Sequence, residues 1–238
     1  KNNDVEKSLA LLKLSSKYVS KVLKVLYEDN HIIAVYKPAG VLTQADETGD
    51  ICLMDEVKEY LKEKYHKLGK VWLGVVHRLD RPVSGIMVYA KTSKGAARLS
   101  EQIRNHTFKK TYHALVIGIP FLESGTLINY LKKDEAKNFV TVFDYETEGA
   151  VWAELDYEIV RTIGDKTIVK INLKTGRPHQ IRAQLAHIGH PVVGDVKYGA
   201  PTALPDRSIA LVATGVEFKL ATKDEIKRIE IEVPKEWM

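Results

Sequence analysis

The chain has 238 residues, 45% of them hydrophobic and 28% charged, which is typical of an ordinary globular protein. Its net charge of +5 favours an anionic partner such as RNA, although many basic proteins bind no nucleic acid. No apolar run is long enough to cross a bilayer, and the single cysteine, Cys52, excludes an internal disulfide. We therefore expect a cytoplasmic protein that has no membrane partner.

The N-terminal part of the chain changes pattern near residue 21. Residues 1–20 place apolar side chains at helical spacing among lysines and serines, which predicts a short amphipathic helix or arm. Short apolar runs at 25–27 and 31–36 are separated by a polar turn, so they predict two strands. Residues 53–67 repeat apolar side chains at steps of three and four, which predicts an amphipathic helix.

The stretch 77–85 lies between two apolar runs, residues 71–76 and 86–90, both rich in β-branched or aromatic residues, as buried strands are. Within it, Asp80 is flanked by two arginines, whose charge favours an ionised carboxylate. An ionised carboxylate suits a nucleophile or a base better than a general acid. We predict an active-site loop here, although an isolated Arg-x-Asp-Arg run is more often a surface salt-bridge cluster.

The rest of the chain is rich in strand patterns. Ser93 can cap a helix that extends to about Asn105, and an alternating strand follows over residues 109–117. Further strands are expected at 126–131, 139–143, 151–161, 168–173, 209–218 and 226–233. A hairpin turn is expected at 164–166, and no linker interrupts the pattern. The sheet is therefore expected to run continuously.

A second motif spans residues 173–199. Pro178 suits the first turn of a helix, and Gly189 can stop that helix. Arg182 lies about one turn beyond His179, on the same side of the helix. A buried arginine on such a helix could pair with the aspartate of the predicted loop.

Three histidines near this helix raise the question of a metal site. His179 and His187 lie eight residues apart, about 80° off one helical face, and His190 follows them. No neighbouring Cys or carboxylate completes a recognisable zinc set. We therefore expect no metal site.

The stretch 77–91 resembles the signature of the RluA class of RNA pseudouridine synthases. In that class His-Arg-Leu-Asp, two variable residues, Thr-Ser-Gly and a strand ending in Ala-Lys frame the catalytic aspartate. Only the threonine position departs, because it is Val83 here. The Lys-Pro-Ala-Gly turn at 37–40 matches the first motif of the class, and 173–199 contains its Thr-Gly-Arg, His-Gln and Ile-Arg elements. The class commonly has a histidine at the position of Val212.

The resemblance implies specific roles for residues in these motifs. Asp80 would be the catalytic aspartate, Arg182 would hold it ionised, and Tyr112 would be the active-site tyrosine. RNA or substrate binding is implied for His77, Arg78, Arg81, Lys110, Arg177, His179 and Leu211. Of these, Arg78 would fill the space that a flipped nucleotide leaves, and Arg177 would lie beside phosphate or substrate.

The function implied is isomerisation of uridine to pseudouridine in structured RNA, either rRNA or tRNA. The bond from ribose C1′ to uracil N1 is cleaved, and the base is rejoined through C5. The implied protein is a monomer that needs no cofactor or metal. The implied fold is α+β, with a mixed, mainly antiparallel sheet flanked by helices and a central active-site cleft, in one catalytic domain over 21–238. Residues 1–20 are too short for an N-terminal S4 domain, so target selection is expected to lie elsewhere.

Two other functions remain open. An RNA-binding or ribosome-assembly protein could keep the fold without catalysis, but the joint presence of Asp80, Tyr112 and Arg182 argues against it. A hydrolase that uses Asp80 with His77 would need a water-activating partner or a metal, and the sequence offers neither.

Overall fold

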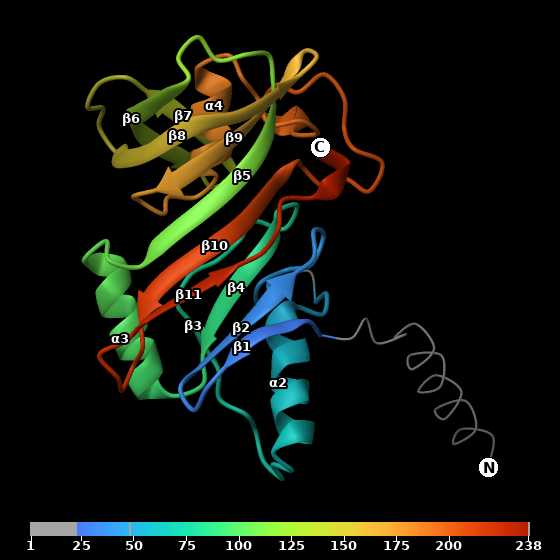
Figure 1. Ribbon diagram of the computed structural model, residues 1–238, viewed down its shortest axis with the longest axis vertical. Coiled ribbons are helices and arrows are strands. Elements are labelled where there is room, and N and C mark those ends of the chain that lie inside the picture. The colour runs from blue at the N-terminus through green and yellow to red at the C-terminus, as the bar shows by residue number, and fades with distance from the viewer. Residues whose placement is uncertain (1–22, 48, 238) are drawn as a thin grey trace, which may run out of the picture.

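A computed structural model describes residues 23–47 and 49–237, and the predicted arm over residues 1–20 lies outside them (Figure 1). The helices are α2 (Leu53–Lys64), α3 (Ser93–Arg104) and α4 (Gln180–His187), with short 3₁₀ turns η1 (Val196–Tyr198) and η2 (Lys235–Trp237). The strands are β1 (Val25–Glu28), β2 (Ile32–Lys37), β3 (Gly74–Val75), β4 (Ser84–Ala90), β5 (Lys109–Ile117), β6 (Ser124–Asp134), β7 (Phe139–Phe143), β8 (Val151–Ile163), β9 (Lys166–Leu173), β10 (Leu211–Lys219) and β11 (Ile226–Glu230).

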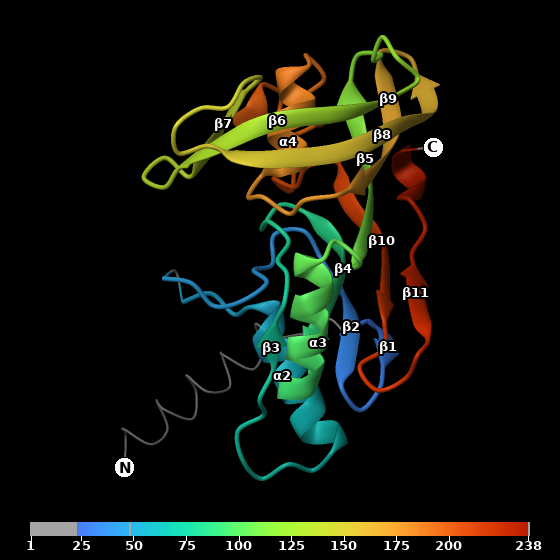
Figure 2. The ribbon, with the colours of Figure 1, turned by 90° about the vertical axis from the view of Figure 1, so that its left-hand side faces the viewer.

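All of these strands belong to one sheet with the order β1-β2-β4-β10-β5-β9-β8-β6-β7, in which β11 pairs with β10 and β3 with β4. Among the described strands only β4 and β10 pair in parallel. The predicted α+β fold with a mixed, mainly antiparallel sheet is confirmed. The expected single domain over 21–238 stays a prediction, which the continuous sheet supports. Helices α2 and α3 lie beside the half of the sheet that contains β2 and β4, and α4 lies beside the half that contains β6, β7 and β8 (Figure 2).

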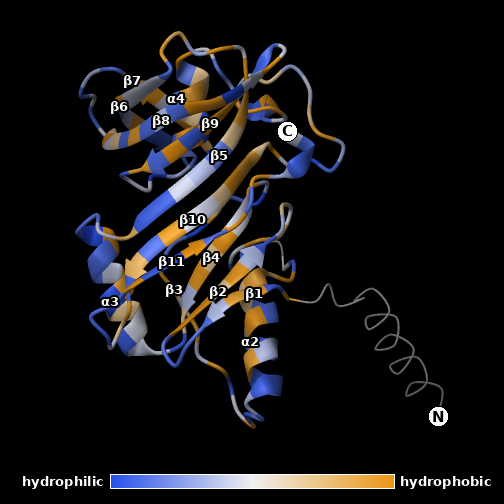
Figure 3. Ribbon diagram, viewed as in Figure 1, coloured by the Kyte–Doolittle hydropathy of each residue, from blue (hydrophilic) through white to orange (hydrophobic). Residues whose placement is uncertain are grey.

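Strands β2 and β4 are buried along nearly their whole length because α2 and α3 cover their two faces, whereas β5 begins with hydrophilic residues (Figure 3). Ile33 and Val35 of β2 pack with the buried side chains of α2, whereas Ile32 and Ala34 face the other way and pack with Leu99 of α3. At the far end of the sheet α4 packs on β6, β7 and β8. These contacts fix α4 relative to the strands that carry the cleft.

Several predicted boundaries differ from the structure. The run 71–76 is mostly not a strand: only β3 forms, and Trp72 is 52% exposed. β3 pairs with β4 at Tyr89 and Ala90, and β4 ends at Ala90, so residues 71–73 have no strand opposite them. Helix α2 ends at Lys64, three residues earlier than predicted. The N-cap of α3 is Thr92, whose side chain accepts a hydrogen bond from the Gly95 N–H.

The parallel contact of β4 with β10 depends on Gly85. Its φ is +123°, and a Cβ there would lie 2.3 Å from the carbonyl oxygen of Ala213 and 2.5 Å from its nitrogen. No side chain fits between two backbones at that separation. The close approach places the loop before β4, which carries Asp80, directly beside β10.

Gly85→Ala is expected to lower the free energy of unfolding by about 3 kcal/mol or more, since it adds both backbone strain and a steric clash. Urea unfolding measures this. Gly69→Ala is the matched control, because nothing lies within 4 Å of its Cβ position and its φ is not positive. Equal stability of the two variants would contradict the packing described above.

Candidate active site

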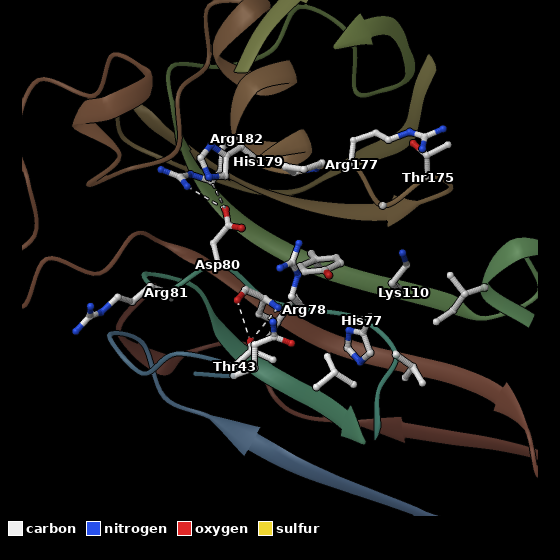
Figure 4. A pocket seen from close by; sticks show the side chains of 18 of the residues that line it. Thr43, His77, Arg78, Asp80, Arg81, Lys110, Thr175, Arg177, His179 and Arg182 are labelled. Atoms are coloured by element: carbon white, nitrogen blue, oxygen red, sulfur yellow. Dashed lines mark hydrogen bonds and ion pairs between the residues drawn. The ribbon is translucent and has the colours of Figure 1, made fainter. Parts of the chain in front are cut away.

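A cleft of about 1170 Å³ lies between the loop before β4, the end of α3 with β5, and the segment before α4 (Figure 4). It is lined by nearly all of the predicted site residues: His77, Arg78, Asp80, Arg81, Lys110, Tyr112, Arg177, His179 and Arg182. Leu211 is not among the lining residues. It pairs with Ala114 on β5 and belongs to the buried core. Residues from both halves of the sheet therefore meet in one cleft.

The Asp80 loop is clamped on both sides of the aspartate. The Lys37 ammonium donates to the carbonyl oxygen of Arg81 (3.2 Å) and to two other backbone carbonyls. Thr43 Oγ1 donates to the carbonyl of Leu79 (3.0 Å) and accepts from its N–H (3.3 Å). Burial lowers the pKa of Lys37 to about 7, although the negative charge of Asp80 opposes this shift. Lys37 and Thr43 thus hold the backbone of the loop on either side of Asp80.

The central contact of the site joins Arg182 to two carboxylates. Its Nε and Nη2 donate to Asp195 at 2.6 and 2.9 Å, and its Nη1 donates to Oδ2 of Asp80 at 2.9 Å. The side chains of Arg182 and Asp195 are 7% and 2% exposed, and that of Asp80 is 29% exposed. Although burial acts in the opposite direction, the hydrogen bonds to the two carboxylates raise the pKa of Arg182, so the guanidinium is charged. Asp195 therefore aims Arg182 at Asp80.

Asp195 was missed as a functional residue. It lies within the quoted motif 173–199, but one acid after a helix carries no periodic signal that would pair it with Arg182. The two arginines that flank Asp80 in sequence do not bind it in the structure. Arg81 donates to Asp50 (2.7 Å) and points away from the carboxylate, and Arg78 lies exposed in the cleft (Figure 4). The cation that holds Asp80 thus comes from a distant segment of the chain.

Tyr112 and Lys110 lie on one face of β5 because side chains alternate along a strand. Tyr112 is buried, and burial together with the charge of Asp80 raises its pKa, so the phenol is neutral. Burial lowers the pKa of Lys110 to about 8. A Cβ at Gly176 would lie 2.9 Å from the Lys110 ammonium, so the glycine leaves room for it.

The segment before α4 turns sharply at His179, whose φ of +50° lies in the left-handed region. Helix α4 therefore begins at Gln180, two residues later than predicted from the proline. The Gln180 side chain holds the turn, because its Oε1 accepts from Thr175 Oγ1 (2.8 Å) and from the Arg177 N–H (3.0 Å). The turn brings His179 Nε2 to 3.9 Å from Asp80 Oδ2.

His77 lines the cleft as a neutral ring. Its Nε2 accepts from the Val88 N–H (3.1 Å), and its Nδ1 is buried without a hydrogen-bond partner among the described residues. Burial lowers its pKa to about 3, and its ring lies 5.6 Å from that of Phe108. Because Nε2 is engaged by the backbone, the ring is not arranged to act as a base with Asp80.

The cleft is strongly basic. Its lysines and arginines are Arg78, Arg81, Arg104, Lys110, Lys133, Lys174, Arg177, Arg182 and Lys197, against the acids Asp46 and Asp80. Such a surface attracts a polyanion. No group of three or more His, Cys, Asp or Glu that could hold a metal occurs within residues 23–47 and 49–237. Within the same ranges, no helix has the length and apolar character of a membrane span.

Comparison with known proteins identifies the relatives of this chain. The profile of the family described as RNA pseudouridylate synthase matches residues 31–187. A protein named tRNA pseudouridine synthase C from Yersinia pestis is 32% identical over 192 residues, which cover 75% of this chain and 71% of that protein. A protein named ribosomal large subunit pseudouridine synthase C from Buchnera aphidicola is 35% identical over 176 residues, which cover 74% of this chain but only 54% of that protein.

The fold has a solved counterpart. The structure of human RNA pseudouridylate synthase domain containing 4 superposes with a TM-score of 0.74 and covers 96% of this chain and 93% of that one, at 20% sequence identity. The architecture is therefore shared although the sequences have diverged widely.

Asp195→Ala is expected to lower the free energy of unfolding by about 3 to 5 kcal/mol, because it leaves the buried Arg182 with half of its compensating charge. Asp80→Asn is the comparison variant. It should cost much less, since Asp80 is partly exposed and Arg182 keeps its two bonds to Asp195. Urea unfolding of both variants measures the difference. A smaller loss of unfolding free energy for Asp195→Ala than for Asp80→Asn would contradict the conclusion that Asp195 stabilises Arg182 more than Asp80 does.

Proposed function

This chain belongs to the RNA pseudouridylate synthase family, in the RluA class that its motifs predicted, and on this premise we propose that it converts uridine to pseudouridine in tRNA or rRNA. We further propose that Asp80 is the catalytic residue and that the protein acts as a cytoplasmic monomer without a cofactor. The relatives matched carry both tRNA and ribosomal names, so both substrates belong to the proposal.

One observation supports this proposal above the others: a charged Arg182 holds one oxygen of Asp80 and leaves the other open. The hydrogen bond from Arg182 goes to Oδ2, whereas Oδ1 accepts none from the residues that the structure describes. Asp80 would act through Oδ1 on the ribose, as nucleophile or as base. The bond from C1′ to N1 breaks, the detached uracil turns in the cleft, and C5 bonds to C1′. The C5 hydrogen then leaves as a proton.

The cleft also supports extraction of the target nucleotide. Flipping a base out of a stack costs a few kcal/mol, and stacking on an aromatic ring returns about 1 to 3 kcal/mol per base. Tyr112 would supply that ring beside Asp80. The exposed Arg78 would occupy the space left in the RNA. Basic side chains of the cleft would contact phosphates, so binding should weaken as salt rises.

Tritium release from RNA that carries 5-tritiated uridine tests the proposal, because formation of the new bond at C5 expels that hydrogen. Wild-type protein should release tritium, and Asp80→Asn should lower the single-turnover rate by at least about a thousandfold while RNA binding changes little. Asp165→Asn is the matched control, since Asp165 is an exposed residue in the turn between β8 and β9. It should release tritium at the wild-type rate.

The substrates for this assay are total tRNA, total rRNA and partly assembled ribosomal particles. No release by wild-type protein from any of them, together with retained RNA binding, would favour a binding protein without catalysis. Equal release by wild type and Asp80→Asn would contradict the assignment of the aspartate.

A further inference from the structure

The ring of His179 lies between Tyr198 and Asp80, with one nitrogen facing each. Nδ1 lies 2.8 Å from the Tyr198 hydroxyl, and Nε2 lies 3.9 Å from Asp80 Oδ2. The Tyr198 hydroxyl also accepts a hydrogen bond of 2.9 Å from the Val140 N–H. A chain of contacts therefore runs from the backbone of β7 through a tyrosine and a histidine to the catalytic carboxylate.

This chain of contacts assigns the proton on the imidazole. The Val140 N–H can only donate, so the Tyr198 oxygen accepts there. Among the described residues, the acceptor within reach of the phenolic hydrogen is Nδ1 of His179. Nδ1 is then unprotonated in the neutral ring, and the hydrogen sits on Nε2, on the side of Asp80. The opposite tautomer would turn a lone pair towards a carboxylate and leave the buried phenol without an acceptor.

Both partners in this contact are held rigidly. The Tyr198 ring is stacked on Phe139 at 4.9 Å between centroids, and the Arg182 guanidinium lies over it at 5.0 Å. His179 has a left-handed backbone, which a non-glycine residue adopts at a cost in free energy. Backbone strain of this kind is typical of sites where a side chain must keep one direction.

The surroundings keep the ring neutral. Burial lowers the pKa of His179, and so do the cations Arg182, Lys197 and Lys133, whereas Asp80 raises it, with a net lowering. At neutral pH the ring therefore presents one N–H to the catalytic carboxylate and carries no charge of its own.

The distance from Nε2 to Asp80 Oδ2 is too long for a direct hydrogen bond. An oxygen atom beside the line between them could bond to both if it accepts from nitrogen and donates to the carboxylate. A hydroxyl group does both. On the proposed substrate, the ribose 2′-hydroxyl is the hydroxyl next to the reacting C1′ carbon.

We infer that His179 is a catalytic hydrogen-bond donor, held in its Nε2–H tautomer by Tyr198, and that it binds the ribose 2′-hydroxyl of the target uridine against Asp80 Oδ2. This inference rests on the proposed function. It makes Tyr198 a positioning residue, and it leaves Oδ1 of Asp80 facing the reacting carbon.

The test is a cycle between His179 and the 2′-hydroxyl, measured as single-turnover tritium release. The substrate is an RNA from which the wild type releases tritium, prepared with either uridine or 2′-deoxyuridine at the target. Removal of the hydroxyl should slow the wild type by about a hundredfold, and His179→Ala should slow release from the unmodified RNA similarly. In the His179→Ala variant, removal of the 2′-hydroxyl should not slow tritium release any further.

Two conservative variants separate this role from a structural one. Tyr198→Phe keeps the stacked ring and its contact with Arg182 but frees the histidine to change tautomer. It should therefore lower the rate of tritium release in the wild-type background and leave the rate unchanged in the His179→Ala background. His179→Gln carries an amide N–H that does not depend on Tyr198, so it should restore part of the rate. A Tyr198→Phe loss that persists in full in the His179→Ala background would overturn the role of Tyr198.

Two results would overturn the inference as a whole. One is an undiminished rate for folded His179→Ala on the unmodified RNA. The other is an equal cost of 2′-hydroxyl removal in wild type and in His179→Ala. If His179→Ala does not fold, the same comparison is made with His179→Gln and Tyr198→Phe. In these variants, removal of the 2′-hydroxyl should slow tritium release less than it does in the wild type. Failure of the proposed function is distinguishable, because the wild type would then release no tritium from unmodified RNA.

Discussion

The guanidinium of Arg182, shared between two carboxylates, is the contact on which the rest of this site depends. Its two bonds to Asp195 fix the plane of the guanidinium, so that the remaining nitrogen can point only at Asp80. The buried cation depends on Asp195 above all, because Asp195 is almost fully buried whereas Asp80 is partly exposed. The positions of helix α4, of the turn that follows it and of the loop before β4 are thus linked energetically through one side chain.

The fold brings these three segments together across the sheet. The Asp80 loop enters β4, which pairs in parallel with β10 at Gly85, while α4 packs on β6, β7 and β8 beyond β5 and β9. The cleft therefore lies where the two halves of the sheet meet. Lys37 and Thr43 hold the loop from one half, and the left-handed turn at His179 orients the start of α4 in the other.

Much of this arrangement could be predicted from the sequence. Alternating and continuous apolar runs located nearly all of the strands, and the motifs placed Asp80, Tyr112 and Arg182 in one site. The parts that failed depend on where distant segments begin and end. The run 71–76 has strand composition, but β4 ends at Ala90, so residues 71–73 have no strand opposite them.

Local sequence also does not specify which ions pair. Asp80 lies between two arginines in sequence, yet Arg81 binds Asp50 and the partner of Asp80 comes from α4. The pairing with Asp195 is set by the turn after α4, and the left-handed backbone of His179 by the hydrogen bonds of Gln180. Neither leaves a periodic pattern in the residues themselves.

The most direct test of this account is the single-turnover rate of tritium release by Arg182→Lys. Lysine keeps the positive charge but lacks the planar fork that reaches both carboxylates at once. If the geometry of the Arg182 guanidinium as well as its charge is needed to position Asp80, the folded variant should release tritium about a hundredfold more slowly than the wild type. A folded Arg182→Lys with a rate close to that of the wild type would show that charge alone suffices, and it would contradict the account.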